Sequence, residues 1–310
     1  GQYIFSSTNV VSGSLAGVQP STPYQIRVAM TQTGLIANGI NLVPTVAKDD
    51  SSANGTLRDS DEVLSGTNTA VVNFTTGLPG ANDHSLDLGF RLPMDFGDLP
   101  DNGASTGPGS YNTYVSRAGP RHVLSGTLKL GTCVTADNDG QPNAPATGDG
   151  CDDGVQRDGT TKWTPGAVIT LNITVTGGTG ALGAWFDWNN DGDFLDAGEF
   201  ISYTNLTPGP HLVTVTIPAG YTTGQTVYSR FRIFDQNNIP GGSLTSNLFT
   251  GLAVGGEVED YVWQFTPTAI TLRDLNGHSD DGALGMLAIA AAAIIGAAIL
   301  FGLTLRRRVT

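Results

Sequence analysis

The stretch Ala184-Trp-Phe-Asp-Trp-Asn-Asn-Asp-Gly-Asp-Phe-Leu-Asp-Ala-Gly-Glu199 places oxygen-bearing side chains at alternate positions of a tight turn. Oxygen ligands spaced in this way converge on one centre, and calcium is a hard cation that prefers oxygen ligands. The spacing differs from that of an EF-hand, because the twelfth position counted from Asp187 is Gly198 and the carboxylate comes one residue later. We therefore predict a calcium site in another kind of loop, against the alternative of a polar turn without metal. The predicted ligands are Asp187, Asn189, Asp191, Asp193, Asp196 and Glu199.

The composition favours an all-β protein. The chain has 310 residues, which is long enough for two domains with their own cores. It contains 42 glycines and is rich in Thr, Val and Asn, as is typical of short strands joined by turns. Acidic residues outnumber basic ones by 28 to 15, and this argues against a nucleic-acid partner, which would need a basic face.

Two motifs carry a resemblance to a known family. The segment Trp185-Phe-Asp-Trp-Asn-Asn-Asp-Gly-Asp-Phe194 and the later Gly256-Glu-Val-Glu-Asp-Tyr261 resemble the GEVED domain, a β-sandwich module of secreted and surface-exposed bacterial proteins. Upstream, Asp95-Phe-Gly-Asp-Leu-Pro-Asp101 and the acidic run between residues 137 and 155 are similar to the segment that usually precedes this domain. The resemblance implies a jelly-roll-like sandwich with acidic calcium loops over residues 94–265.

Residues 1–93 suggest a second sandwich. Strand patterns at Gly1–Phe5, Tyr24–Ala29 and Val71–Phe74 resemble in their order the C-terminal part of a B-type repeat domain from the serine-aspartate surface proteins of bacteria, an immunoglobulin-like or prealbumin-like sandwich. The opening strands of that family are missing. The chain is then a fragment, a processed form, or a domain that receives strands from elsewhere. An incomplete sandwich has an unpaired edge that invites a partner strand.

The C-terminal tail predicts a membrane anchor. Residues 283–305 carry no charge and have about the length of a helix that crosses a bilayer. Three arginines follow at 306–308, which places this end in the cytoplasm and both domains on the periplasmic or extracellular side of a bacterial cytoplasmic membrane. We expect a juxtamembrane stalk over 266–282, a single transmembrane helix over 283–305 and a cytoplasmic stub over 306–310. The frequent Ala and Gly residues suit either a lone anchor or a helix docked on others.

Other polar residues give weaker signals. Cys133 and Cys151 can form a disulfide outside the cytoplasm, and two unpaired thiols are the alternative. Asp59 and Asp61 lie in a turn that either binds calcium or is merely solvated.

The carboxylates of the second motif alternate along a predicted strand. Glu257 and Glu259 point to one face, whereas Val258 and Asp260 point to the other. The glutamate pair either completes a metal site begun by Asp187 or forms a surface row beside aromatic side chains.

Catalysis has little support in the sequence. Its many carboxylates show no spacing typical of a glycoside hydrolase, its four histidines lack zinc-ligand spacing, and no Gly-x-Ser-x-Gly motif is present. We predict a non-catalytic, membrane-anchored interaction or structural protein with calcium as its cofactor. Its expected partners are the lipid bilayer, other membrane or surface proteins, or carbohydrate. One alternative is an accessory structural subunit of a larger membrane complex, for example a respiratory or photosynthetic one, and another is a carbohydrate-binding adhesin.

Overall fold

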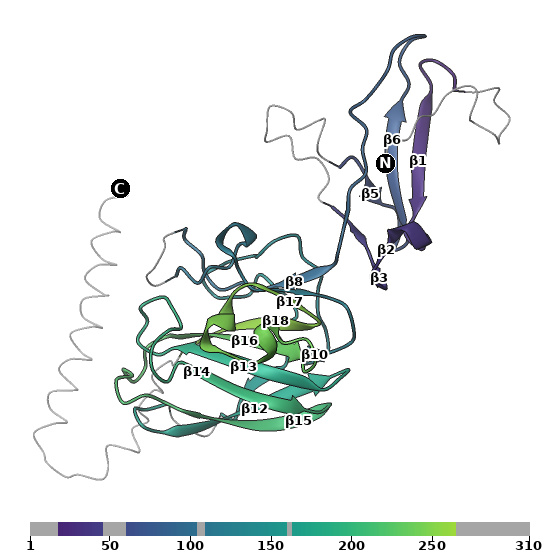
Figure 1. The fold of residues 1–310 in the computed structure, drawn as a ribbon. Helices are drawn as coiled ribbons and strands as arrows, with labels where there is room; N and C mark the ends of the chain where they lie inside the picture. Colours follow the sequence, from purple (N-terminus) through teal and green to yellow (C-terminus); the bar gives the residue numbers. More distant parts are fainter. Residues whose placement is uncertain (1–17, 46–59, 104–108, 160–162, 265–310) are drawn as a thin grey trace, which may run out of the picture. The chain divides into compact units, whose positions relative to one another are not determined.

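The computed structural model describes residues 18–45, 60–103, 109–159 and 163–264 (Figure 1). These ranges consist of strands, loops and short 3-10 turns and contain no α-helix, so the all-β prediction is confirmed for them. No helix in them is long and apolar enough to cross a membrane. The predicted stalk, transmembrane helix and stub all lie outside the described residues.

The first region is built on one long antiparallel pair. Its elements are β1 (Pro23–Ala29), the 3-10 turn η1 (Thr33–Leu35), β2 (Ile36–Ala37), β3 (Ile40–Asn41), β4 (Val43–Pro44), β5 (Val63–Leu64), β6 (Thr69–Thr75) and β7 (Phe90–Arg91). Strands β1, β6 and β5 form a three-stranded sheet in that order, while β2 pairs with β3 and β4 with β7. The predicted strands at 24–29 and 71–74 are confirmed. The predicted strand at 1–5 lies outside the described residues, and the immunoglobulin-like or prealbumin-like sandwich stays a prediction.

The second region holds the longer strands. Its elements are β8 (Met94–Phe96), η3 (Val115–Arg117), β9 (Arg121–Val123), β10 (Lys129–Leu130), β11 (Val155–Arg157), β12 (Val168–Thr176), β13 (Gly180–Asp187), β14 (Phe200–Leu206), β15 (Gly209–Thr216), β16 (Val227–Asp235), η4 (Pro240–Gly242), η5 (Ser246–Phe249), β17 (Leu252–Val254) and β18 (Gly256–Trp263). One sheet has β12 at its centre, paired with β15 on one edge and with β10 and β11 on the other. A second sheet runs β14-β13-β16-β18, and a third runs β17-β9-β8.

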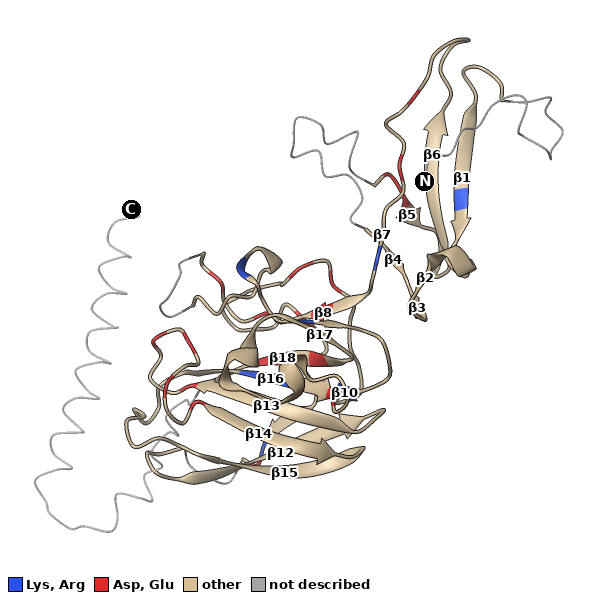
Figure 2. Cartoon of the chain, viewed as in Figure 1, with Lys and Arg blue, Asp and Glu red and all other residues tan. Residues whose placement is uncertain are grey.

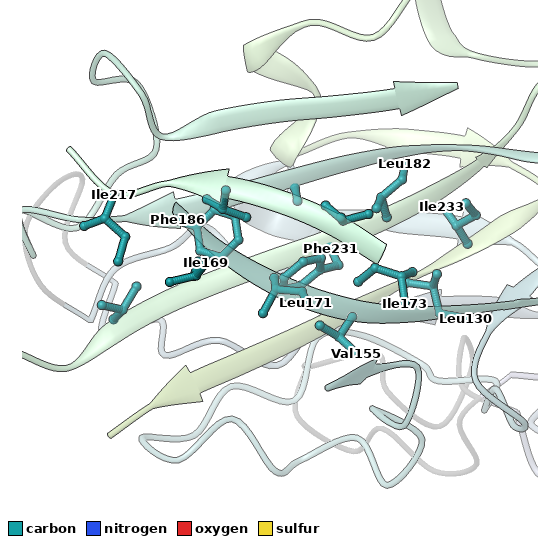
Figure 3. Close-up of a cluster of buried hydrophobic side chains, with 14 of the residues drawn as sticks. Leu130, Val155, Ile169, Leu171, Ile173, Leu182, Phe186, Ile217, Phe231 and Ile233 are labelled. Atoms are coloured by element: carbon teal, nitrogen blue, oxygen red, sulfur yellow. The ribbon is translucent and has the colours of Figure 1, made fainter. Parts of the chain in front are cut away.

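The main hydrophobic core lies between the β12 sheet and the β13 sheet (Figure 3). Strand β12 buries alternate residues, Ile169, Leu171, Ile173 and Val175, because only one of its faces meets the core. Phe186 and Phe231 reach the same core from β13 and β16. Full burial of one such side chain contributes about 1.5–3 kcal/mol, so this cluster is the main source of stability in the region.

Strand β13 is buried at every position, because both of its faces are covered. On the face away from the main core, Trp185 and Phe234 pack with Leu99, Tyr111 and Phe194. The ring of Trp185 lies over Gly183, where a Cβ atom would collide with it. The acidic segments that follow β8 and β13 therefore rest on this second face and are held there by aromatic packing.

Candidate metal centre

The predicted calcium loop is closed at both ends by buried carboxylates. Asp187 Oδ2 accepts hydrogen bonds from Tyr111 Oη at 2.6 Å and from the amide of Gly192 at 3.0 Å. Glu199 accepts from the amides of Trp188 and Asp196, both at 3.0 Å. Burial is the first cause that raises the pKa of Asp187, and it raises the pKa of Glu199 to about 7. These two side chains therefore fix the shape of the loop.

The other predicted ligands lie on the outer part of the loop. The side-chain amide of Asn189 donates from Nδ2 to Asp191 Oδ2 at 2.9 Å and to Asp196 Oδ2 at 2.6 Å. Asp193 Oδ1 accepts from the amide of Leu195 at 2.9 Å. The chain thus brings the six predicted residues into one hydrogen-bonded loop, and calcium binding there stays a prediction.

A second acidic group is more compact. Asp95, Asp137 and Asp149 each offer a carboxylate oxygen, and these oxygens lie within 4.8 Å of one another. Asp95 belongs to β8, whereas the other two lie between Cys133 and Cys151. Both acidic segments belong to the resemblance to the segment before a GEVED domain, but the order of their residues does not predict that three of their side chains meet.

Contacts from separate segments hold this group together. Asp95 Oδ2 accepts from the amide of Val258 in β18 at 2.6 Å, and the amide of Asp137 donates to Met94 O at 2.7 Å. Thr135 Oγ1 donates to Asp149 Oδ1 at 2.9 Å. The pKa of Asp95 is raised well above its usual value, mainly by burial and also by the neighbouring carboxylates.

Burial, and to a lesser extent the neighbouring Asp149, raise the pKa of Asp137 to about 6. Within the described ranges none of the three aspartates forms an ion pair with Lys, Arg or His. A donor set made only of carboxylate oxygens suits a hard divalent cation such as calcium.

The alternation predicted for the second motif is confirmed, since it forms β18. Glu257 and Glu259 face the main core, and Glu259 Oε1 accepts from the amides of Asp153 and Gly154 at 3.0 and 2.8 Å. Glu257 accepts from the amide of Leu130. The pKa of Glu257 is raised to about 11 and that of Glu259 to about 8, and burial is the largest cause of both shifts.

Neither interpretation offered for this glutamate pair holds. The strand register sets Glu259 on the face of Phe231, whereas Asp187 aligns with Tyr228 and Val262 on the opposite face. A single site shared with Asp187 is therefore excluded by the sheet itself. The pair is not a surface row either, because both glutamates are only 1% exposed.

Strand β16, which carries two arginines, pairs with the acidic strand β18 (Figure 2), and Arg230 lies opposite Asp260. Arg230 pairs with Asp260 through two hydrogen bonds, Nε to Oδ1 at 2.8 Å and Nη2 to Oδ2 at 2.9 Å. Arg232 donates to His122 Nε2 at 2.9 Å and to four backbone carbonyl groups. The two arginines of β16 thus connect neighbouring loops to the sheet.

The remaining predicted residues are placed as follows. Cys133 and Cys151 form the predicted disulfide, with 5.4 Å between their Cα atoms. Asp59 lies outside the described residues. Asp61 Oδ2 accepts from the amide of Asp87 at 3.0 Å, which joins two segments of the first region.

Comparison with known proteins bears on part of this region. No curated protein and no solved structure matches the chain. A family model does match residues 181–264, which run from β13 through the loop between Asp187 and Glu199 to the end of β18. That model is described as the GEVED domain, so the resemblance carried by the two motifs is confirmed for these residues.

Proposed function

We propose that the chain is a non-catalytic, membrane-anchored structural and interaction protein whose β domains lie outside the bacterial cytoplasmic membrane and bind calcium. The observation that carries the calcium part is the group of Asp95, Asp137 and Asp149, with oxygens within 4.8 Å of one another. Calcium takes about six to eight oxygen ligands, and water can complete the three carboxylates. The loop from Asp187 to Glu199 is the second proposed position.

The use of the buried carboxylates supports a structural role. Asp95, Glu259 and Asp260 each accept hydrogen bonds from backbone amides of segments far away in the sequence. A carboxylate that already receives such bonds holds loops in place. Calcium would offset the repulsion among these charges and so favour the folded state.

The anchor is supported by the sequence of the tail alone. Residues 283–305 are uncharged and are followed by three arginines, and their small side chains allow close packing with other helices. We propose that other membrane or surface proteins are the partners.

One experiment tests both anchor and partners. Native membranes are solubilised in a mild detergent, the chain is isolated through its β domains, and the proteins that migrate with it are identified. A stoichiometric set of integral membrane proteins supports an accessory subunit, whereas recovery of the chain alone supports a free-standing surface protein. Release of the chain by a high-salt wash without detergent contradicts the anchor.

A further inference from the structure

A polar cavity of about 440 Å³ lies among four turns of the second region. It is lined by residues 125–128 before β10, residues 177–179 between β12 and β13, residues 235–237 at the end of β16, and Gly255 between β17 and β18. None of the proposed calcium ligands lines it. Its volume lies within the range of about 300–1,000 Å³ that is typical of small-molecule sites.

Hydrogen bonds and close packing fix the walls of this cavity. Thr127 Oγ1 donates to Gly177 O at 2.8 Å, and a Cβ atom on Gly177 would collide with Thr127 O. The first two turns are therefore packed directly against each other. Gln236 Oε1 accepts from the amide of Asn205 at 2.8 Å, which holds the third turn. A cavity that is formed in advance loses little free energy to ordering when a ligand binds.

Asp235 provides the acceptor side of the cavity. Its Oδ1 atom accepts from the amide of Asn237 and its Oδ2 atom from Asn238 Nδ2, both at 2.9 Å. A carboxylate has about four acceptor positions, so these two bonds leave room for two more donors. Two adjacent hydroxyl groups of a ligand can therefore donate to this one side chain.

Amide and hydroxyl side chains provide the donor side. Gln236 accepts from Asn205 through Oε1, and its Nε2 atom carries two N–H donors. Asn237 is exposed and supplies a second side-chain amide, while Ser125 and Thr179 carry hydroxyl groups on two other walls. A sugar hydroxyl group both donates and accepts, so it requires the two kinds of partner that this cavity combines.

The remaining lining residues suit a neutral ring. A Cβ atom on Gly255 would lie 3.3 Å from Asp235 Cβ and 3.4 Å from Ser125 Oγ, so the bare backbone keeps the space between these polar groups open. Leu128 supplies an apolar wall. Among the lining residues, all of which the structure describes, Asp235 alone is charged. One carboxylate repels an anionic ligand and is too few for a calcium ion.

We propose that this cavity binds a neutral carbohydrate. Two adjacent hydroxyl groups of the sugar donate to Asp235, the side-chain amides of Gln236 and Asn237 donate to sugar oxygens, and Leu128 contacts the C–H face of the ring. The inference goes beyond the proposed function, because it needs neither calcium nor the membrane anchor.

The test is saturation-transfer NMR on the full chain in a detergent that contains no sugar. The probes are neutral oligosaccharides of glucose, mannose, galactose or N-acetylglucosamine, with an oligomer of galacturonic acid as the anionic comparison. We expect saturation transfer to at least one neutral probe and none to the anionic one. Absence of transfer to every neutral probe overturns the inference.

A matched pair of variants locates the binding. Gly126 lines the cavity, and a Cβ atom added there meets no atom within 4 Å, so Gly126→Phe should obstruct the cavity without strain and remove the signal. A Cβ atom on Gly220 likewise meets no atom within 4 Å, but Gly220 does not line the cavity, so Gly220→Phe should keep the signal. Equal signals from the wild type and Gly126→Phe overturn the inference.

A smaller change tests the hydrogen bonds. Asn237→Ala keeps the backbone amide that donates to Asp235 and removes only the exposed side-chain amide. We expect the affinity for the probe to fall about two- to tenfold, as for the loss of one hydrogen bond, at an unchanged melting temperature. An unchanged affinity contradicts the role given to Asn237. Calcium binding is measured separately, so failure of this inference leaves the proposed function standing.

Discussion

At the residue scale, Arg230 joins three parts of the second region through one side chain. It pairs with Asp260 on the adjacent strand and donates to the carbonyl groups of Tyr111 and Phe249 in two separate loops. Both charges of the pair are fully buried. Loss of one partner leaves the other charge without compensation, which costs far more than the loss of an exposed ion pair.

We expect Arg230→Gln to lower the free energy of unfolding by about 3–5 kcal/mol, because Asp260 is left buried and unpaired. The matched control is Arg121→Gln in the same region. Arg121 is half-buried and makes one side-chain hydrogen bond, to Gly119 O at 3.1 Å, so its loss should cost about 1 kcal/mol. Urea denaturation measures both values. Equal losses in the two variants would show that the buried pair has no special weight.

His122 gives stability a dependence on pH. In the folded protein the pKa of His122 is lowered well below 6.5, mainly by burial and also by the charge of Arg232. The unfolded chain takes up a proton below about pH 6.5 that the folded protein does not bind, so this contribution is present above that pH and is lost as the pH falls. Between pH 6.5 and 5 the loss amounts to at most about 2 kcal/mol.

Comparison with His122→Gln isolates this effect, because the acidic groups with raised pKa values titrate in both proteins. The free energy of unfolding is measured by urea denaturation at pH 7 and pH 5 in excess calcium. The wild type should lose more stability than the variant between these two conditions. The same change in both proteins would mean that His122 does not titrate differently in the folded and unfolded states.

At the element scale, β18 shows how far sequence patterns reach. The alternation of its side chains predicted which residues share a face, and the strand register confirms it. It did not predict that both faces are covered, because a period of two says nothing about what packs on either side. Glu257 and Glu259 are buried since the segments around Leu130 and Gly154 fold over them.

The group of Asp95, Asp137 and Asp149 was beyond sequence reasoning for a related reason. Ligand spacing within one loop can be read from the order of residues, as for Asp187 to Glu199. A site made from β8 and two turns of a distant loop depends on which segments meet in the fold. The sequence shows that both segments are acidic, but it does not show that their side chains lie close together in the fold.

The disulfide between Cys133 and Cys151 closes the loop that carries Asp137 and Asp149. We expect the double substitution Cys133→Ser and Cys151→Ser to cost about 3 kcal/mol of stability, mainly by freeing the unfolded chain. Calcium affinity should fall too, because two of the proposed ligands then lie in an open loop. Denaturation and calcium titration measure the two effects. An unchanged affinity would show that the contacts of Asp137 and Asp149 suffice to place them.

At the scale of the whole molecule, the described part of the second region is all-β as expected, with its main core between two sheets, and its jelly-roll-like sandwich type stays a prediction. The prediction came from two motifs and from composition, which report strands and turns but not their pairing. For example, the strand order β14-β13-β16-β18 could not be predicted without knowing that β15 pairs with β12 in the other sheet. The predicted membrane span at 283–305 rests on the uncharged sequence itself.

In the proposed function, calcium stabilises the folded β domains. The most direct measurement is thermal unfolding of the full chain in detergent, first stripped of metal in EDTA and then with calcium or magnesium added. We predict a higher melting temperature in calcium than in EDTA, with a gain of about 2.7 kcal/mol at a calcium concentration one hundred times the dissociation constant. Magnesium should give a smaller gain, because it requires stricter geometry. An identical transition in EDTA and in calcium would contradict the account.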